Sequence, residues 1–209
     1  MLRWSPLLAT ALLVLMLGPS CGYAQEAPSE SARVLSADLH EAQRAHLWRV
    51  AAWGGANVLG GLALMGASTR GGSSSARWHF GAMSAGWGVV NVGIATAGLL
   101  ATPDAPLTDP AAALSAERQF HDILLLNLGL NVGYAAVGGT MLAAGYRGID
   151  RAARWRGFGS SLILQGAGLL ALDGVAFIAS RTRLASLLDT TAQVSVQAAP
   201  NTIALTLHF

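Results

Sequence analysis

Polar side chains recur at helical spacing inside stretches of this sequence that are otherwise apolar. Trp53 and Asn57 stand four residues apart, and Trp87 and Asn91 repeat the pattern 34 residues later. Because residues four apart lie on one face of an α-helix, each pair should give its helix a polar face. The residues that such spacings group on helix faces are Trp53, Asn57, Trp87, Asn91, Asn127, Asn131, Tyr134, Gln165 and Asp173. Since an unpaired amide or carboxylate is costly in an apolar solvent, we expect these side chains to face one another.

Two interpretations of this polar cluster are open. In the first, the amides of the Asn and Gln side chains form hydrogen bonds between helices, each contributing on the order of 1 kcal/mol. In the second, the cluster lines a hydrated cavity for a small polar ligand or an ion, and Asp173 is its only member able to carry a charge. The sequence favours packing over a binding cavity.

Histidines offer a different kind of site. His46 and His121 are candidate haem ligands, because two helical histidines at one depth of a bundle can hold a haem iron. The competing interpretation is that His121 and Asp122 form a hydrated pair at a helix boundary. The chain has no Cys/His cluster, HExxH, GxxxxGK[ST] or GxSxG motif, so we expect neither a cofactor nor a metal site, and we expect that the protein is not an enzyme.

Composition indicates which solvent surrounds these helices. Hydrophobic residues make up 53% of the 209 residues and charged residues only 11%, whereas water-soluble domains carry about 25% charged residues. The net charge of +2 is too small for a nucleic-acid surface. Four apolar segments without Arg or Lys, each close to the ~20 residues that cross a bilayer, lie at residues 50–67, 79–101, 120–145 and 158–180. We therefore predict an all-α membrane protein, a bundle of four transmembrane helices.

Local signals place the ends of these helices. Ser36 can cap a helix that starts before the first span, and Asp109-Pro110 is a cap followed by proline at the first helical position. The first and third helices should therefore extend beyond the membrane. Residues 184–209 are predicted to form an extramembrane tail with a short β-hairpin, because residues 193–196 and 203–209 alternate polar and apolar side chains.

Residues 1–24 have the pattern of a signal peptide. Arg3 precedes an apolar stretch, and Gly18-Pro19 precedes the small residues before the cleavage point after Ala24. A lipoprotein anchored through Cys21 is the alternative. Cleavage would leave residues 25–183 as the transmembrane domain and no cysteine in the mature chain, which excludes disulfides and thiolate metal sites.

Arginines indicate the orientation in the membrane. The loop at residues 68–77 has two Arg and no acid, a net charge of +2, and the loop at residues 146–157 has four Arg and one Asp, a net charge of +3. Because positive loops remain in the cytoplasm, we predict a protein of the bacterial inner membrane with both termini in the periplasm.

Several motifs together resemble a family of small bacterial integral membrane proteins of unknown function. The likeness covers about residues 45–175 and implies four membrane helices and no activity. Its motifs are His79–Met83, Trp87–Asn91 with Ile94-Ala95, Leu126–Asn131 with Tyr134 and Gly138, Gly157–Gly159, and Gln165-Gly166 with Asp173. The chain departs from that pattern at Ser84 and Gly88, where the resemblance leads us to expect asparagine.

Small residues indicate possible contacts with other helices. Gly129 and Gly133, and the set Ala52, Ala56 and Gly60, follow the spacing that lets two membrane helices approach closely. They predict a homo-oligomer or a membrane-protein partner within the lipid bilayer. We therefore expect a non-enzymatic structural or scaffolding subunit of the bacterial envelope, with a transporter component that binds a small molecule or an ion as the alternative.

Overall fold

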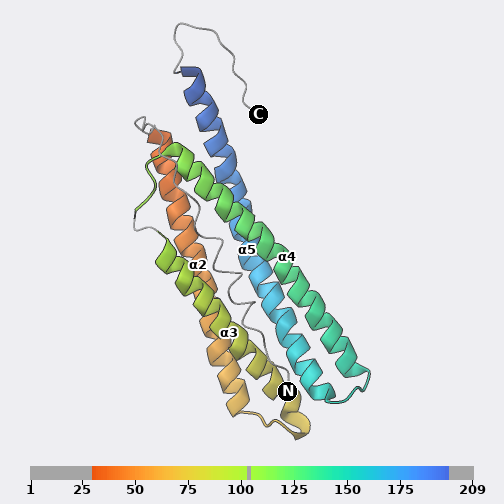
Figure 1. The fold of residues 1–209 in the computed structure, drawn as a ribbon. Helices are drawn as coiled ribbons and strands as arrows, with labels where there is room; N and C mark the ends of the chain where they lie inside the picture. Colours follow the sequence, from red (N-terminus) through yellow and green to blue (C-terminus); the bar gives the residue numbers. More distant parts are fainter. Residues whose placement is uncertain (1–29, 103–104, 198–209) are drawn as a thin grey trace, which may run out of the picture.

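The computed structural model describes residues 30–102 and 105–197, and most of them lie in four long helices (Figure 1). The predicted signal peptide at residues 1–24 lies outside these ranges. The elements are α2 (Glu30–Gly66), the short 3-10 helix η2 (Gly72–Ser74), α3 (Ser75–Ala101), α4 (Pro110–Tyr146) and α5 (Ala152–Gln197). The four predicted helices are thus confirmed.

The helices form two antiparallel hairpins, α2 with α3 and α4 with α5, which lie side by side (Figure 1). The loops of both hairpins, residues 67–74 and 147–151, lie at the same end of the bundle, which we name the loop end. At the opposite end, named the extension end, α2, α4 and α5 continue past the end of α3 (Figure 1). A helix of 37 residues, such as α2 or α4, is about 55 Å long, well beyond the ~30 Å of a bilayer's hydrocarbon core.

Glycines allow the two helices of each hairpin to touch along their backbones. A Cβ atom added to Gly54 would lie 2.8 Å from the carbonyl oxygen of Gly88, and one added to Gly88 would lie 2.7 Å from the backbone nitrogen of Val58. In the second hairpin, a Cβ on Gly138 would lie 2.7 Å from the carbonyl oxygen of Gly159. Such contacts are closer than real Cβ atoms allow, so any larger residue must push the helices apart.

The distribution of side chains is the reverse of that in a water-soluble bundle. Large apolar side chains such as Leu59, Leu100 and Val175 are 72%, 83% and 65% exposed, while the fully buried positions include Gln165, Glu117 and Ser180. Contiguous exposed apolar surface of this kind marks contact with a membrane or a partner. Three helices, within residues 72–101, 111–146 and 152–189, are long and apolar enough to cross a membrane.

The first predicted span does not meet the same criterion. The part of α2 that follows Arg49 ends with the helix at Gly66 and contains Asn57 and five glycines, so it is less apolar than the segments of the other three helices. Residues 30–102 and 105–197 therefore contain three candidate spans instead of the predicted four. α2 still packs along α3 and α5 over this apolar segment.

Two local predictions are wrong, and one is confirmed. Residues 193–196 belong to α5, and residues 30–102 and 105–197 contain no strand; four alternating residues are too few to distinguish a strand from a helix that is already propagating. The other half of the predicted hairpin, residues 203–209, lies outside the described residues. Ser36 does not cap α2, because the helix starts at Glu30 and includes Ser36, whose hydroxyl is buried. Asp109 does cap α4, since its carboxylate accepts hydrogen bonds from the backbone nitrogens of the next turn at 3.1 and 3.3 Å.

Candidate functional site

The first of three polar layers inside the bundle joins α2 to α5 through side-chain amides. The indole Nε1 of Trp53 donates to Oε1 of Gln165 at 3.1 Å, and Nε2 of Gln165 donates to Oδ1 of Asn57. Asn57 in turn donates to the carbonyl oxygen of Trp53 at 2.8 Å. We name these three residues the amide layer. Both polar atoms of the Gln165 side chain are therefore bonded inside the protein, as the packing interpretation expects.

The second layer gathers three helices around Asp173. Its Oδ2 accepts a hydrogen bond from Nδ2 of Asn131 at 2.7 Å, and its Oδ1 lies 3.1 Å from Nε2 of His46. All three side chains are buried, with residue exposures of 3%, 3% and 5% for Asp173, Asn131 and His46. We name them the Asp173 layer. A carboxylate at this depth requires such partners, because burying it without any would be strongly unfavourable.

The third layer lies towards the extension end and was not predicted. Glu117 of α4, which is 0% exposed, accepts from Nε of Arg183 at 2.9 Å and from Nη2 of the same residue at 3.3 Å. Ser180 also donates to this carboxylate, and its Oγ lies 3.3 Å from Nδ1 of His121. The imidazole of His121 stacks on Phe177, with ring centroids 4.4 Å apart. Glu117, His121, Ser180 and Arg183 form what we name the Glu117 layer.

A spacing of seven residues could have revealed this third layer. Heptad spacing marks the buried seam of helices that pack as coiled coils. The buried positions at this interval are Glu117, Leu124, Asn131, Gly138 and Gly145 in α4, and Gly159, Gly166, Asp173, Ser180 and Leu187 in α5. Because polar and glycine residues fill most of these positions, a search for apolar heptads does not find the pattern.

The remaining predicted residues lie around α3 and α4. The rings of Trp87 and Tyr134 contact each other with centroids 4.8 Å apart. Asn91 is buried, and its Nδ2 has no hydrogen-bond partner. Asn127 is half-buried and does not take part in the three layers. A hydrogen bond of 2.8 Å that was not predicted joins Ser84 of α3 to Ser161 of α5; at Ser84 the resemblance led us to expect asparagine.

An apolar core separates the amide layer from the Asp173 layer. Val50 of α2, Ala95 of α3 and Leu169 of α5 pack together there, and Ala51 and Trp53 pack against them. Leu169 stands between Gln165 and Asp173 along α5. The polar groups thus form separate layers rather than one continuous polar path along the bundle.

The two candidate haem ligands each engage a protein side chain. Nε2 of His46 faces Asp173, and Nδ1 of His121 faces Ser180. Nδ1 of His46 is buried and has no hydrogen-bond partner. No group of three or more His, Cys, Asp or Glu side chains is arranged to hold a metal ion within residues 30–102 and 105–197.

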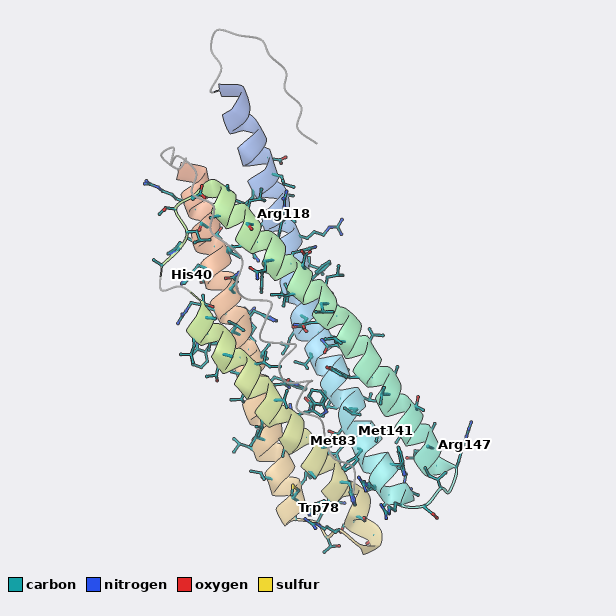
Figure 2. The ribbon with its side chains drawn as sticks, viewed as in Figure 1. His40, Trp78, Met83, Arg118, Met141 and Arg147 are labelled. Atoms are coloured by element: carbon teal, nitrogen blue, oxygen red, sulfur yellow. The ribbon has the colours of Figure 1, made fainter. Side chains whose placement is uncertain are left out.

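The layers lie between two charged ends of the molecule. Figure 2 shows Trp78 and Arg147 at the loop end, and His40 and Arg118 towards the extension end. At the loop end three guanidinium groups lie over aromatic rings: Arg70 over Trp78 at 4.4 Å, Arg154 over Phe158 at 5.2 Å and Arg156 over Tyr146 at 5.5 Å. These contacts hold basic side chains beside aromatic ones, a combination typical of a membrane–water interface.

Comparison with known protein families shows to which family the chain is related. Residues 49–174 match a family described as "Family of unknown function (DUF6992)". The chain belongs to this family. The DUF6992 match includes both partners of the Asn57–Gln165 and Asn131–Asp173 bonds, whereas His46, Ser180 and Arg183 lie outside it. The range agrees with the resemblance expected for about residues 45–175. No curated protein and no solved structure matches the chain.

Proposed function

We propose that this DUF6992 protein is a non-enzymatic structural or scaffolding subunit of the bacterial inner membrane. The observation that carries the proposal is that the buried polar side chains bond directly to one another across helices in the amide, Asp173 and Glu117 layers. Polar side chains that hydrogen-bond to one another across helices hold those helices in register. The pocket between Asp122 and Leu130 on α4 and the pocket at the start of α3 include no residue of these layers.

A scaffold needs a surface for its partners, and the outer faces of α2 and α4 supply one. Ala52, Ala56 and Gly60 are exposed on α2, and Gly129 and Gly133 are exposed on α4 with nothing within 4 Å of a Cβ added to either glycine. Small residues facing outward let a neighbouring helix approach closely in lipid. We propose that the α4 face holds a second copy of this chain or another membrane protein.

The mass of the purified protein in neutral detergent, measured by light scattering, tests this proposal. We expect a complex larger than one chain, and we expect that Gly129→Leu with Gly133→Leu dissociates it. Ala167→Leu with Ala171→Leu, which adds similar volume on the outer face of α5, should leave the mass unchanged. A single chain with no co-purified membrane protein would contradict the scaffolding role.

The alternative function, binding of a small molecule or an ion, is favoured by one observation. The imidazole of His46 faces Asp173 through Nε2, and its other nitrogen, Nδ1, is buried without a hydrogen-bond partner; a buried polar atom of this kind normally bonds to something. A cation site at Asp173 would make the thermal stability depend on which monovalent cation is present, and Asp173→Asn would remove that dependence. The structural role instead expects the same melting temperature in lithium, sodium and potassium salts of equal ionic strength.

A further inference from the structure

A pocket at the loop end has a chemistry different from that of the three layers. It is an open pocket of about 380 Å³ where the start of α3, the end of α4 and the start of α5 meet. Pockets for small ligands begin at roughly 300 Å³. The side chains that give it its chemistry are Ser73, Arg77, Phe80, Tyr146, Arg156 and Ser160. Two arginines and three residues with hydroxyl groups, two serines and a tyrosine, therefore line one space, and no acidic residue lines it.

The backbone holds the two arginines on either side of a tight helix crossing. A Cβ added to Gly157 would clash with the carbonyl oxygen of Ala76 and would lie 2.8 Å from the backbone nitrogen of Phe80. Only glycine permits α5 to approach α3 this closely. Because Arg77 follows Ala76 and Arg156 precedes Gly157, the crossing itself brings the two side chains to the same pocket.

The side chain of Arg156 is also fixed along its length. Its Cγ lies only 2.7 Å from the position that a Cβ on Gly145 would take, so the side chain packs against this glycine. Its guanidinium group lies over the ring of Tyr146. Next to the pocket, Gly72 takes φ +70°, a conformation that suits glycine, and thereby turns the loop into α3. The side chain of Arg156 is therefore held in place by the fold.

Among the residues that the structure describes, no carboxylate forms an ion pair with an arginine of the pocket. In the described part of the chain, the ion pairs join His46 to Asp173 and Arg183 to Glu117, and neither involves a pocket arginine. Nε of Arg156 is buried and has no hydrogen-bond partner. A buried N–H of a cation is strongly stabilised by a charged acceptor, so the site suits an anion with several oxygens.

We propose that this pocket binds the phosphate group of an anionic phospholipid headgroup. Arginine presents a planar set of N–H donors that matches phosphate oxygens, and the two serine hydroxyls can donate further hydrogen bonds. Basic pockets between membrane helices on the positively charged side bind such headgroups. The lipid source, rather than free phosphate, is supported by Tyr146, which lines the pocket and is 72% exposed, because Tyr gathers at the headgroup level of a membrane.

Binding of defined lipids to the full chain, delipidated in neutral detergent, tests this site. Native mass spectrometry would compare phosphatidylglycerol, phosphatidylcholine and inorganic phosphate as ligands. We expect that phosphatidylglycerol binds best, and that Arg77→Gln with Arg156→Gln weakens its binding by about tenfold or more. Glutamine keeps the Cγ atom that packs against Gly145, so this variant removes the charge and retains the packing.

The matched control removes the same charge from the same end of the bundle. Arg147→Gln with Arg154→Gln lies outside the pocket and should weaken phosphatidylglycerol binding much less. Equal weakening by both pairs would overturn the proposal, because it would show only diffuse attraction to positive charge. Tighter binding of inorganic phosphate than of phosphatidylglycerol would overturn the lipid assignment.

A second variant keeps the test decisive if the double substitution fails to fold. Arg77 is exposed, so Arg77→Gln alone should preserve the melting temperature of the lipid-free protein. It should still weaken phosphatidylglycerol binding relative to the single control Arg147→Gln. An unchanged affinity in a folded Arg77→Gln protein would overturn the proposal.

Discussion

Asp173 depends on partners from two other helices, and that dependence makes the residue informative. Its carboxylate accepts from Asn131 and faces His46. Removal of one member of a buried pair leaves the other without compensation, which costs about 1–3 kcal/mol for a hydrogen-bonded pair and about 3–5 kcal/mol for an ion pair. Removal of both members can cost less than the sum of the two single losses. The same logic applies to Glu117 and Arg183 in the layer nearer the extension end.

We therefore predict strong coupling between His46 and Asp173. His46→Leu and Asp173→Leu should each lower the free energy of unfolding by about 1–3 kcal/mol. The loss in the double variant should be smaller than the sum of the two single losses by at least ~0.5 kcal/mol. Reversible unfolding in mixed detergent micelles measures all four proteins. Asp122→Asn, a change at an exposed carboxylate, should shift stability by less than about 0.5 kcal/mol. Additive losses would show that the Asp173 layer is not an energetic unit.

At the scale of the helices, close packing of α2 on α3 depends on positions where no side chain fits. We predict that Gly88→Val lowers the free energy of unfolding by about 1–3 kcal/mol, because its Cβ would lie 2.7 Å from the backbone nitrogen of Val58. Gly55 is the matched control, since nothing lies within 4 Å of a Cβ added there. Gly55→Ala should leave stability unchanged or raise it by up to ~1 kcal/mol through helix propensity. If both variants behave alike in thermal unfolding, the close approach of the helices does not limit stability.

The helices were predictable because long apolar segments and one strong cap define them. Asp109-Pro110 marked the start of α4 correctly, since that signal is local. The Ser36 prediction was wrong because a buried serine inside a helix looks the same in sequence as a serine that caps one. The hairpin prediction failed for a similar reason: a short alternating run does not say whether the preceding helix continues through it.

The candidate site was predictable in part. Trp53, Asn57 and Gln165 were expected to meet, and so were Asn131 and Asp173, because polar residues inside apolar helices must find partners. Glu117 was missed because it precedes the apolar segment of its helix, where a charged residue is normally solvated. The position is buried because α4 and α5 continue to pack together beyond their apolar segments, where Arg183 of α5 pairs with Glu117.

For the whole molecule, the apolar exterior and the different charges of its two ends indicate how the bundle would be oriented in a membrane. Arginine side chains gather on both loops of the loop end, whereas Glu117 and Asp122 belong to the half nearer the extension end. The structure places both loops at the same end of the bundle (Figure 1), as an even number of crossings between them requires. This arrangement makes the predicted cytoplasmic location of the loop end testable with labels on three exposed residues.

We predict that Arg70→Cys and Asp150→Cys, one in each loop, react with a membrane-impermeant maleimide in inside-out vesicles and not in right-side-out vesicles. Gln119→Cys, exposed on α4 towards the extension end, should show the opposite pattern. The reason is that arginine-rich loops resist export across the inner membrane. Detergent-permeabilised vesicles, in which all three cysteines should react, control for reactivity, and Cys21→Ser removes the background from unprocessed chain. If the two loops are labelled from opposite sides, α3 and α4 do not cross the bilayer together, and the proposed membrane scaffold is wrong. If the labelling pattern of all three positions is reversed, the loop end with its arginines lies outside the cytoplasm.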